Sequence, residues 1–125
     1  MGDPVVQNYP VEGDQDGSTK KVTWTLTTAD HTGTAVKLPE WADRTIQFGG
    51  TWGGATAIVE GSQDNVLFGG LSNAAGGAAI SKTADAGPVS IIELPIYMRP
   101  RLSVVGAGAT VTATLLLRRA NPMRT

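Results

Sequence analysis

Hydrophobic and polar residues alternate with a period of two in two segments of the chain. Residues 20–28 read KKVTWTLTT, and residues 110–117 read TVTATLLL. Successive side chains of a β-strand point to opposite faces, so this alternation is typical of a strand with one buried face. It predicts that Trp24 points into the core together with Val22 and Leu26.

Shorter apolar runs between these two segments predict further strands, because Gly, Pro, Asn and Asp residues separate them. Residues 71–87 are rich in Ala and Gly, and we expect a loop there with one short apolar stretch around Ile80. In the predicted strand of residues 44–48, Ile46 and Phe48 fall on one face. The predicted strands are residues 34–39, 44–48, 55–62, 65–70, 88–94 and 101–106.

The sequence predicts an all-β fold. No stretch of ten or more residues has a helical period, although residues 39–44 (PEWADR) have the composition of a single helical turn. Short strands with turn signals between them favour an antiparallel β-sandwich or a Greek-key, jelly-roll-like barrel. Parallel sheets would need crossover helices, for which the sequence offers no candidate.

The chain of 125 residues fits one domain. Residues 20–125 are expected to form a single β-domain, preceded by an extended N-terminal arm over residues 1–19, where Pro and Gly interrupt any periodicity. This arm still carries several apolar residues, which suggests that it orders against a partner surface. Its predicted contact residues are Val5, Val6, Tyr9 and Val11.

The net charge of −1 hides an uneven distribution along the chain. Residues 1–19 contain four carboxylates and no Lys or Arg, which gives −4, and residues 99–125 contain five arginines and no Asp or Glu, which gives +5. This pattern fits either ordinary solvated charge or complementary ends that meet a neighbouring copy or another protein. We expect no nucleic-acid partner, because the basic residues are few and have no aromatic residues between them.

The sequence offers little for catalysis or for cofactor binding. It has no cysteine, and its only histidine, His31, lies in a polar turn without a G-x-S-x-G motif elsewhere. Residues 13–18 (GDQDGS) resemble the start of a calcium loop but lack the glutamate that closes one. We therefore expect no enzyme, no cofactor and no metal. We also expect no membrane span and no signal peptide, and hence synthesis in the cytoplasm.

Residues 50–65 (GTWGGATAIVEGSQDN) combine a glycine-rich run with a strand-like run. A phosphate-binding glycine loop leads into a helix, whereas this one leads into a predicted strand. We favour a strand that ends near Phe48, a bend through Gly49 and Gly50, and a new strand from about Ala55. Trp52 is a sugar-stacking platform if it is exposed, but the small number of other aromatic residues favours burial or a subunit contact.

Residues 94–102 (LPIYMRPRL) are a candidate protein interface. Tyr97, Met98, Arg99 and Arg101 belong to residue types enriched at interfaces. The prolines in this segment favour an extended backbone. An alternative interpretation is an edge strand that its prolines protect from aggregation.

Residues 44–119 as a whole resemble a group of small structural proteins of tailed bacteriophages. The resemblance rests on the order of five short elements: a Gly-Thr-aromatic-Gly-Gly-Ala-Thr strand, a Gly-Ser-x-Asp turn, a Pro-x-aromatic-hydrophobic-Arg-Pro segment, a glycine turn and a final Thr/Leu strand. This chain departs from the group in the turn GSQDNVLF and in the Ala- and Gly-rich loop. The elements fall at residues 50–56, 61–65, 95–100, 106–108 and 111–117.

The resemblance implies a β-domain of a virion. We expect a capsid decoration (cement) protein on the outer capsid surface that stabilises contacts between subunits of the major capsid protein, its partner. Self-association into a homo-oligomer, with a trimer as the expected state, would fit this role. The alternatives are a carbohydrate-binding, adhesive virion module that uses Trp52, Trp41 or Trp24, and a tail or head–tail connector component.

Overall fold

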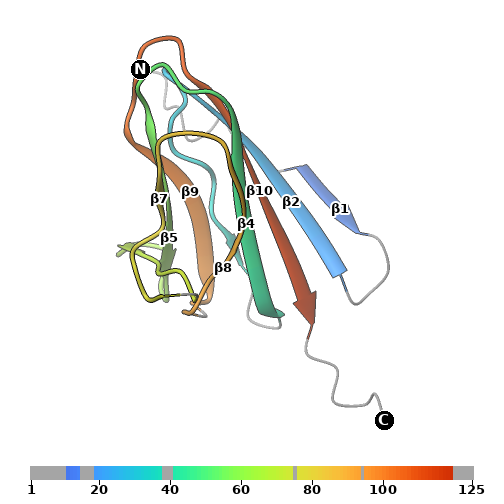
Figure 1. The fold of residues 1–125 in the computed structure, drawn as a ribbon. Coiled ribbons are helices and arrows are strands. Elements are labelled where there is room, and N and C mark those ends of the chain that lie inside the picture. Colours follow the sequence, from blue (N-terminus) through green and yellow to red (C-terminus); the bar gives the residue numbers. More distant parts are fainter. Residues whose placement is uncertain (1–10, 15–18, 38–40, 75, 94, 120–125) are drawn as a thin grey trace.

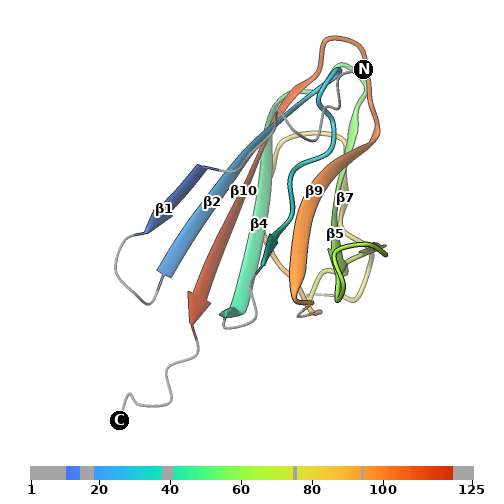
Figure 2. The same ribbon diagram turned by 180° about the vertical axis from the view of Figure 1, so that it is seen from behind.

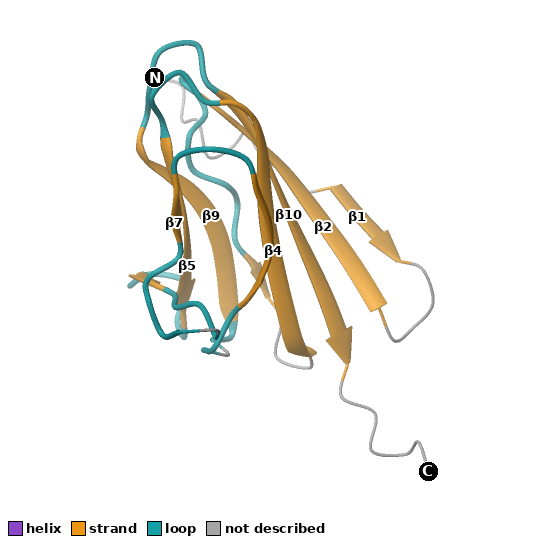
Figure 3. Ribbon diagram, viewed as in Figure 1, coloured by secondary structure: helices purple, strands orange, loops and turns teal. Residues whose placement is uncertain are grey.

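The computed structural model describes residues 11–14, 19–37, 41–74, 76–93 and 95–119, and these residues form an all-β fold (Figures 1 and 3). None of them belongs to a helix, and so no helix among them is long and apolar enough to cross a membrane. The strands are β1 (Val11–Asp14), β2 (Thr19–Thr27), β3 (Val36–Lys37), β4 (Trp41–Thr51), β5 (Thr56–Ser62), β6 (Gly69–Gly70), β7 (Ser81–Lys82), β8 (Ala86–Ser90), β9 (Tyr97–Val104) and β10 (Thr110–Arg119).

The first sheet has the strand order β1-β2-β10-β4-β8 and is antiparallel throughout. Strand β10 lies in its centre and pairs along its length with β2 on one side and β4 on the other. All three strands alternate between buried and more exposed positions. Trp24 is 1 % exposed and points into the core, as its alternation predicts.

The second sheet has the order β3-β9-β5-β6, with β7 pairing with β5 as well. It packs against the first sheet, and Figures 1 and 2 show the two layers from opposite sides. The fold is therefore a β-sandwich, and the described strands do not close into a barrel. The largest fully buried side chains come from both sheets: Val22, Trp24, Leu26, Ile46, Val59, Met98, Pro100, Leu102, Val111, Leu115 and Leu117.

Several sequence predictions of local structure are wrong. The bend through Gly49 and Gly50 lies within β4, which continues to Thr51, and Gly50 stays in the ladder opposite Val111 with a φ of 137°. The turn comes later, where the Ala55 amide donates to the Trp52 carbonyl at 2.8 Å. Residues 41–44 of the predicted helical turn belong to β4, because their register continues the pairing with β10.

A third error concerns residues 65–70, where only Gly69–Gly70 form a strand, β6. The edge-strand interpretation of residues 94–102 is also wrong, because β9 lies between β5 and β3. Proline has no amide hydrogen to donate, but the carbonyl of Pro100 accepts a hydrogen bond from the Gly33 amide at 2.9 Å. Pro100 therefore still contributes a hydrogen bond inside the sheet.

Within the segment that we expect to be an arm, residues 11–14 form β1, which pairs with β2. Its register places Asp14 opposite Lys20 in the backbone ladder. The predicted contact residues Val5, Val6 and Tyr9 lie outside the described residues.

Candidate protein-binding surface

Strand β9 divides the predicted interface residues between two faces. Met98 is fully buried in the core, so its expected role as a surface contact is wrong. Tyr97, Arg99 and Arg101 are half-buried and lie on the opposite, outer face of the second sheet, because side chains alternate along a strand. Val11, the fourth predicted contact of the arm, is the first residue of β1 and pairs with Thr23.

Glu60 on β5 holds both arginines of this outer face. Arg99 Nε donates to Glu60 Oε1 at 3.1 Å, while Arg101 Nε and Nη2 donate to Glu60 Oε2 at 3.1 Å and 2.9 Å. Glu60 is only 6 % exposed, and the arginine side chains keep 25 % and 34 % of their surface. The carboxylate therefore fixes two guanidinium groups whose outer sides face solvent.

The charge state of Glu60 follows from this geometry. Burial alone would raise its pKa, but the hydrogen bonds from Arg101 and Arg99 and their positive charges outweigh it and lower the pKa. Glu60 is therefore ionised at neutral pH. Lys37 on β3 lies beside Tyr97, and the charged residues of β3, β5 and β9 (Lys37, Arg99, Arg101 and Glu60) sum to a net charge of +2 (3 − 1).

The Arg99 guanidinium is held on its other side by an aromatic ring. Its carbon lies 3.7 Å from the centroid of the Phe68 ring, which is a cation–π distance. Phe68 is half-buried and ends the loop that connects β5 to β6. This contact joins the arginine pair to the loop of residues 63–68.

Side-chain hydrogen bonds shape the loop of residues 63–68. Ser62 Oγ accepts from the Asn65 amide at 2.9 Å and donates to Asp64 Oδ1 at 2.9 Å. The same carboxylate oxygen accepts from the amides of Val66 and Leu67, each at 2.9 Å. These backbone hydrogen bonds, from Leu67 and then Val66, lower the pKa of Asp64, so the network is intact at neutral pH.

Val66 and Leu67 form an exposed apolar tip, here called the tip. The two residues are 81 % and 79 % exposed, although Asp64 fixes their backbone amides. Neighbouring exposed apolar residues on an ordered loop are typical of an interaction site. A hollow of about 330 Å³ lies beside the tip and is lined by residues 61–63, 67, 69–71, 93 and 95.

No sequence prediction assigns a functional role to Glu60, Phe68 or the tip. The motif SQDN before the tip carries a turn signal, because Ser and Asp side chains bind nearby backbone amides. The partnership of Glu60 with the arginines has no comparable local signal, since it depends on the pairing of β5 with β9.

Arg44, on β4, fixes the position at which β9 begins. It is 3 % exposed, and its Nη1 donates to the Pro95 carbonyl at 2.6 Å and contacts Met98 Sδ at 3.3 Å. Burial lowers its pKa. This side chain connects the two sheets beneath the outer face that carries Arg99.

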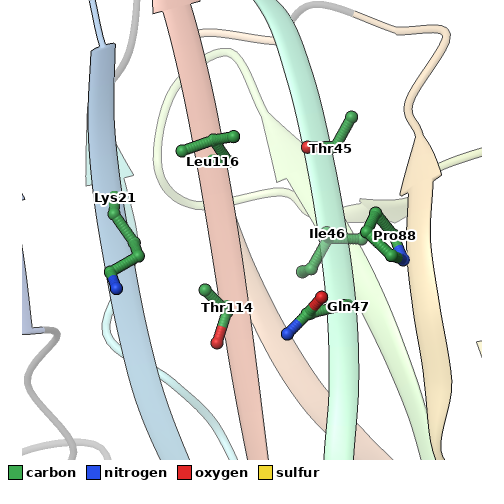
Figure 4. Close-up of a pocket in the computed structure, with 7 residues that line it drawn as sticks. All are labelled: Lys21, Thr45, Ile46, Gln47, Pro88, Thr114 and Leu116. Carbon is green, nitrogen blue, oxygen red and sulfur yellow. The ribbon is translucent and has the colours of Figure 1, made fainter.

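A second hollow, of about 320 Å³, lies on the outer face of the first sheet (Figure 4). Its lining spans β2, β10, β4 and β8 and contains threonines, and Lys21 is the only charged residue among the described residues that line it. The lining residues are Lys21, Thr45, Ile46, Gln47, Pro88, Thr114 and Leu116.

Trp24 and Trp52, two of the sugar-binding candidates from the sequence, form hydrogen bonds within the fold. Trp24 lies in the core, and its Nε1 donates a hydrogen bond to the Thr34 carbonyl at a distance of 2.8 Å. Trp52 is half-buried against the core, and its Nε1 donates to Asp85 Oδ1 at 2.8 Å. His31 lies in the loop between β2 and β3, and the part of the chain that the structure describes contains no cluster of three metal-binding side chains.

Comparison with known proteins gives a likeness in fold. No protein-family model and no curated protein matches the sequence. Among solved structures, the chain is similar to the SPBc2 prophage-derived protein YomS, with a TM-score of 0.55 and 12 % sequence identity. The match covers 84 % of this chain and 98 % of YomS, so the two share most of the sandwich.

Proposed function

We propose that this chain is a structural protein of a bacteriophage particle, and specifically a capsid decoration protein. It would bind the outer capsid surface and stabilise contacts between subunits of the major capsid protein, without an enzymatic activity. The tip beside the Arg99–Arg101 pair is the observation that carries this proposal. Similarity to a prophage-derived fold and the resemblance of residues 44–119 to phage structural proteins support it.

The physical argument concerns the tip. A protein without a partner gains nothing from an ordered loop that exposes two aliphatic side chains, whereas a docking surface gains from preorganisation, because less entropy is lost on binding. Aromatic, arginine and aliphatic groups in one patch are the composition of an interface core. The hydrogen bond of Trp52 to Asp85 and the burial of Trp24 favour this role over that of a sugar-binding module.

The experiment uses phage particles purified from a lysate or from an induced strain, in either case of a phage or prophage that carries the gene. Peptide mass spectrometry of purified particles should detect this chain, and purified protein should bind particles that lack it. A double variant Val66→Ser, Leu67→Ser should bind these particles much more weakly. Val104→Ser is the matched control, because Val104 is another exposed aliphatic residue, 53 % exposed, at the far end of β9. Absence of the chain from particles would refute the proposal.

A further inference from the structure

The Arg99–Arg101 pair retains donors that Glu60 does not use. Glu60 accepts hydrogen bonds from Nε of Arg99 and from Nε and Nη2 of Arg101. Among the described residues, no partner accepts from Nη1 and Nη2 of Arg99 or from Nη1 of Arg101. These three amino groups belong to side chains that are a quarter to a third exposed.

We infer that this pair binds a carboxylate side chain of a partner protein, next to the site at which the tip enters an apolar pocket of that partner. The inference rests on the proposed function, because it specifies the contact through which the particle is bound. A guanidinium group binds a carboxylate through two parallel hydrogen bonds. Glu60 occupies one side of each group, and a second carboxylate on the solvent side completes it.

Charge and surroundings select this occupant. On the strands β3, β5 and β9, two arginines and Lys37 against Glu60 leave a net charge of +2, so an added anion lowers the electrostatic repulsion between these side chains. A free phosphate would satisfy the same donors but would leave the tip exposed. A protein that presents an acidic side chain beside an apolar pocket covers both features at once.

Glu60 is a positioning residue in this scheme. It fixes both guanidinium planes before the partner arrives, and the Phe68 ring at 3.7 Å restrains Arg99 from another side. Loss of side-chain entropy on binding is therefore small, which is the advantage of a preorganised donor pair.

Carbodiimide cross-linking tests the inference on full-length protein bound to particles. The reagent joins a lysine amine to a carboxylate in direct contact with it, and Arg101→Lys places such an amine at the site. We expect a cross-link from residue 101 to an Asp or Glu of a particle protein, identified by mass spectrometry. Ser103→Lys, an exposed position two residues further along β9, controls for random cross-linking and should give less than about a tenth of this product.

A neutral variant supplies the second measurement. Glu60→Gln, Arg99→Gln and Arg101→Gln together remove the charges without leaving a buried carboxylate unpaired. We expect its affinity for particles to fall at least about tenfold, as for loss of a bidentate charged contact, and its salt dependence to weaken. Circular dichroism checks that this variant is folded.

The outcomes separate the two proposals. Wild-type protein that binds particles while residue 101 cross-links only to Glu60 of its own chain would overturn the inference and leave the proposed function standing. A cross-link to a second copy of this chain would also overturn it, since the carboxylate would then belong to self-association. Wild-type protein that fails to bind particles would refute the proposed function itself.

Discussion

Replacing Glu60 with Gln perturbs the charged centre of the proposed interface and leaves its shape nearly unchanged. The carboxylate accepts three hydrogen bonds, one from Arg99 and two from Arg101. A glutamine offers one carbonyl oxygen, and its NH₂ group then faces a guanidinium, donor against donor. At least one of the charged hydrogen bonds is lost, and the arginines lose their counter-ion.

The magnitude follows from these contacts. A hydrogen bond to a charged group contributes about 1.5–3 kcal/mol. The arginine side chains are 25 % and 34 % exposed, so water replaces part of what is lost. We expect Glu60→Gln to lower the free energy of unfolding at pH 7 by about 1–3 kcal/mol. With a urea slope of about 2 kcal/mol per M, the midpoint falls by about 1 M.

The pH dependence gives an independent check. Hydrogen bonds from the arginines outweigh burial and hold the pKa of Glu60 below its ordinary value of 4.5. A carboxylate whose pKa is lower in the folded state stabilises the fold above its unfolded pKa and loses this effect as pH falls through its folded pKa. The stability difference between wild type and Glu60→Gln is therefore complete at pH 7 and shrinks below pH 4.5.

Urea unfolding, followed by tryptophan fluorescence at pH 7 and at decreasing pH, measures both effects. Asp43→Asn is the matched control, because Asp43 is an exposed carboxylate on β4, and its midpoint should stay within the error of wild type. Equal midpoints for wild type and Glu60→Gln at pH 7, or a difference that grows toward low pH, would show that Glu60 does not hold the arginines as described.

Two further predictions concern single side chains. Gly33→Ala should destabilise the fold by about 1–3 kcal/mol in urea unfolding, since its Cβ would lie 2.8 Å from Pro100 Cδ; Gly69→Ala, with no atom within 4 Å, is the control, and equal losses would contradict the argument. Trp52→Phe removes the largest influence that lowers the pKa of Asp85, so this pKa should rise in a carbon-13 titration of the carboxyl group; an unchanged pKa would contradict the hydrogen bond.

The sandwich class was accessible from sequence because its determinants are local. Alternation in residues 20–28 and 110–117 reports directly which side chains face the core, and the burial of Trp24 and Leu115 agrees with it. The same alternation places Met98 and Arg99 on opposite faces of β9, so residues 94–102 do not form one contact surface.

The candidate site was less accessible, for two physical reasons. The apolar residues 66–68 have the composition of a strand. However, the side chains of Ser62 and Asp64 accept hydrogen bonds from backbone amides that a strand would use for pairing. The Glu60–Arg99 contact arises from the register of β5 with β9, which joins residues distant in sequence. A single sequence does not specify this register.

The central position of β10 has a consequence for the newly made chain. Strands β2 and β4 are its two neighbours, and both are synthesised long before residues 110–119 leave the ribosome. Until then each presents an unpaired edge and an uncovered apolar face, the features that promote aggregation of nascent proteins. Folding of the first sheet must wait for release of this segment, and a chain cut between β9 and β10 should precipitate rather than persist as a smaller domain.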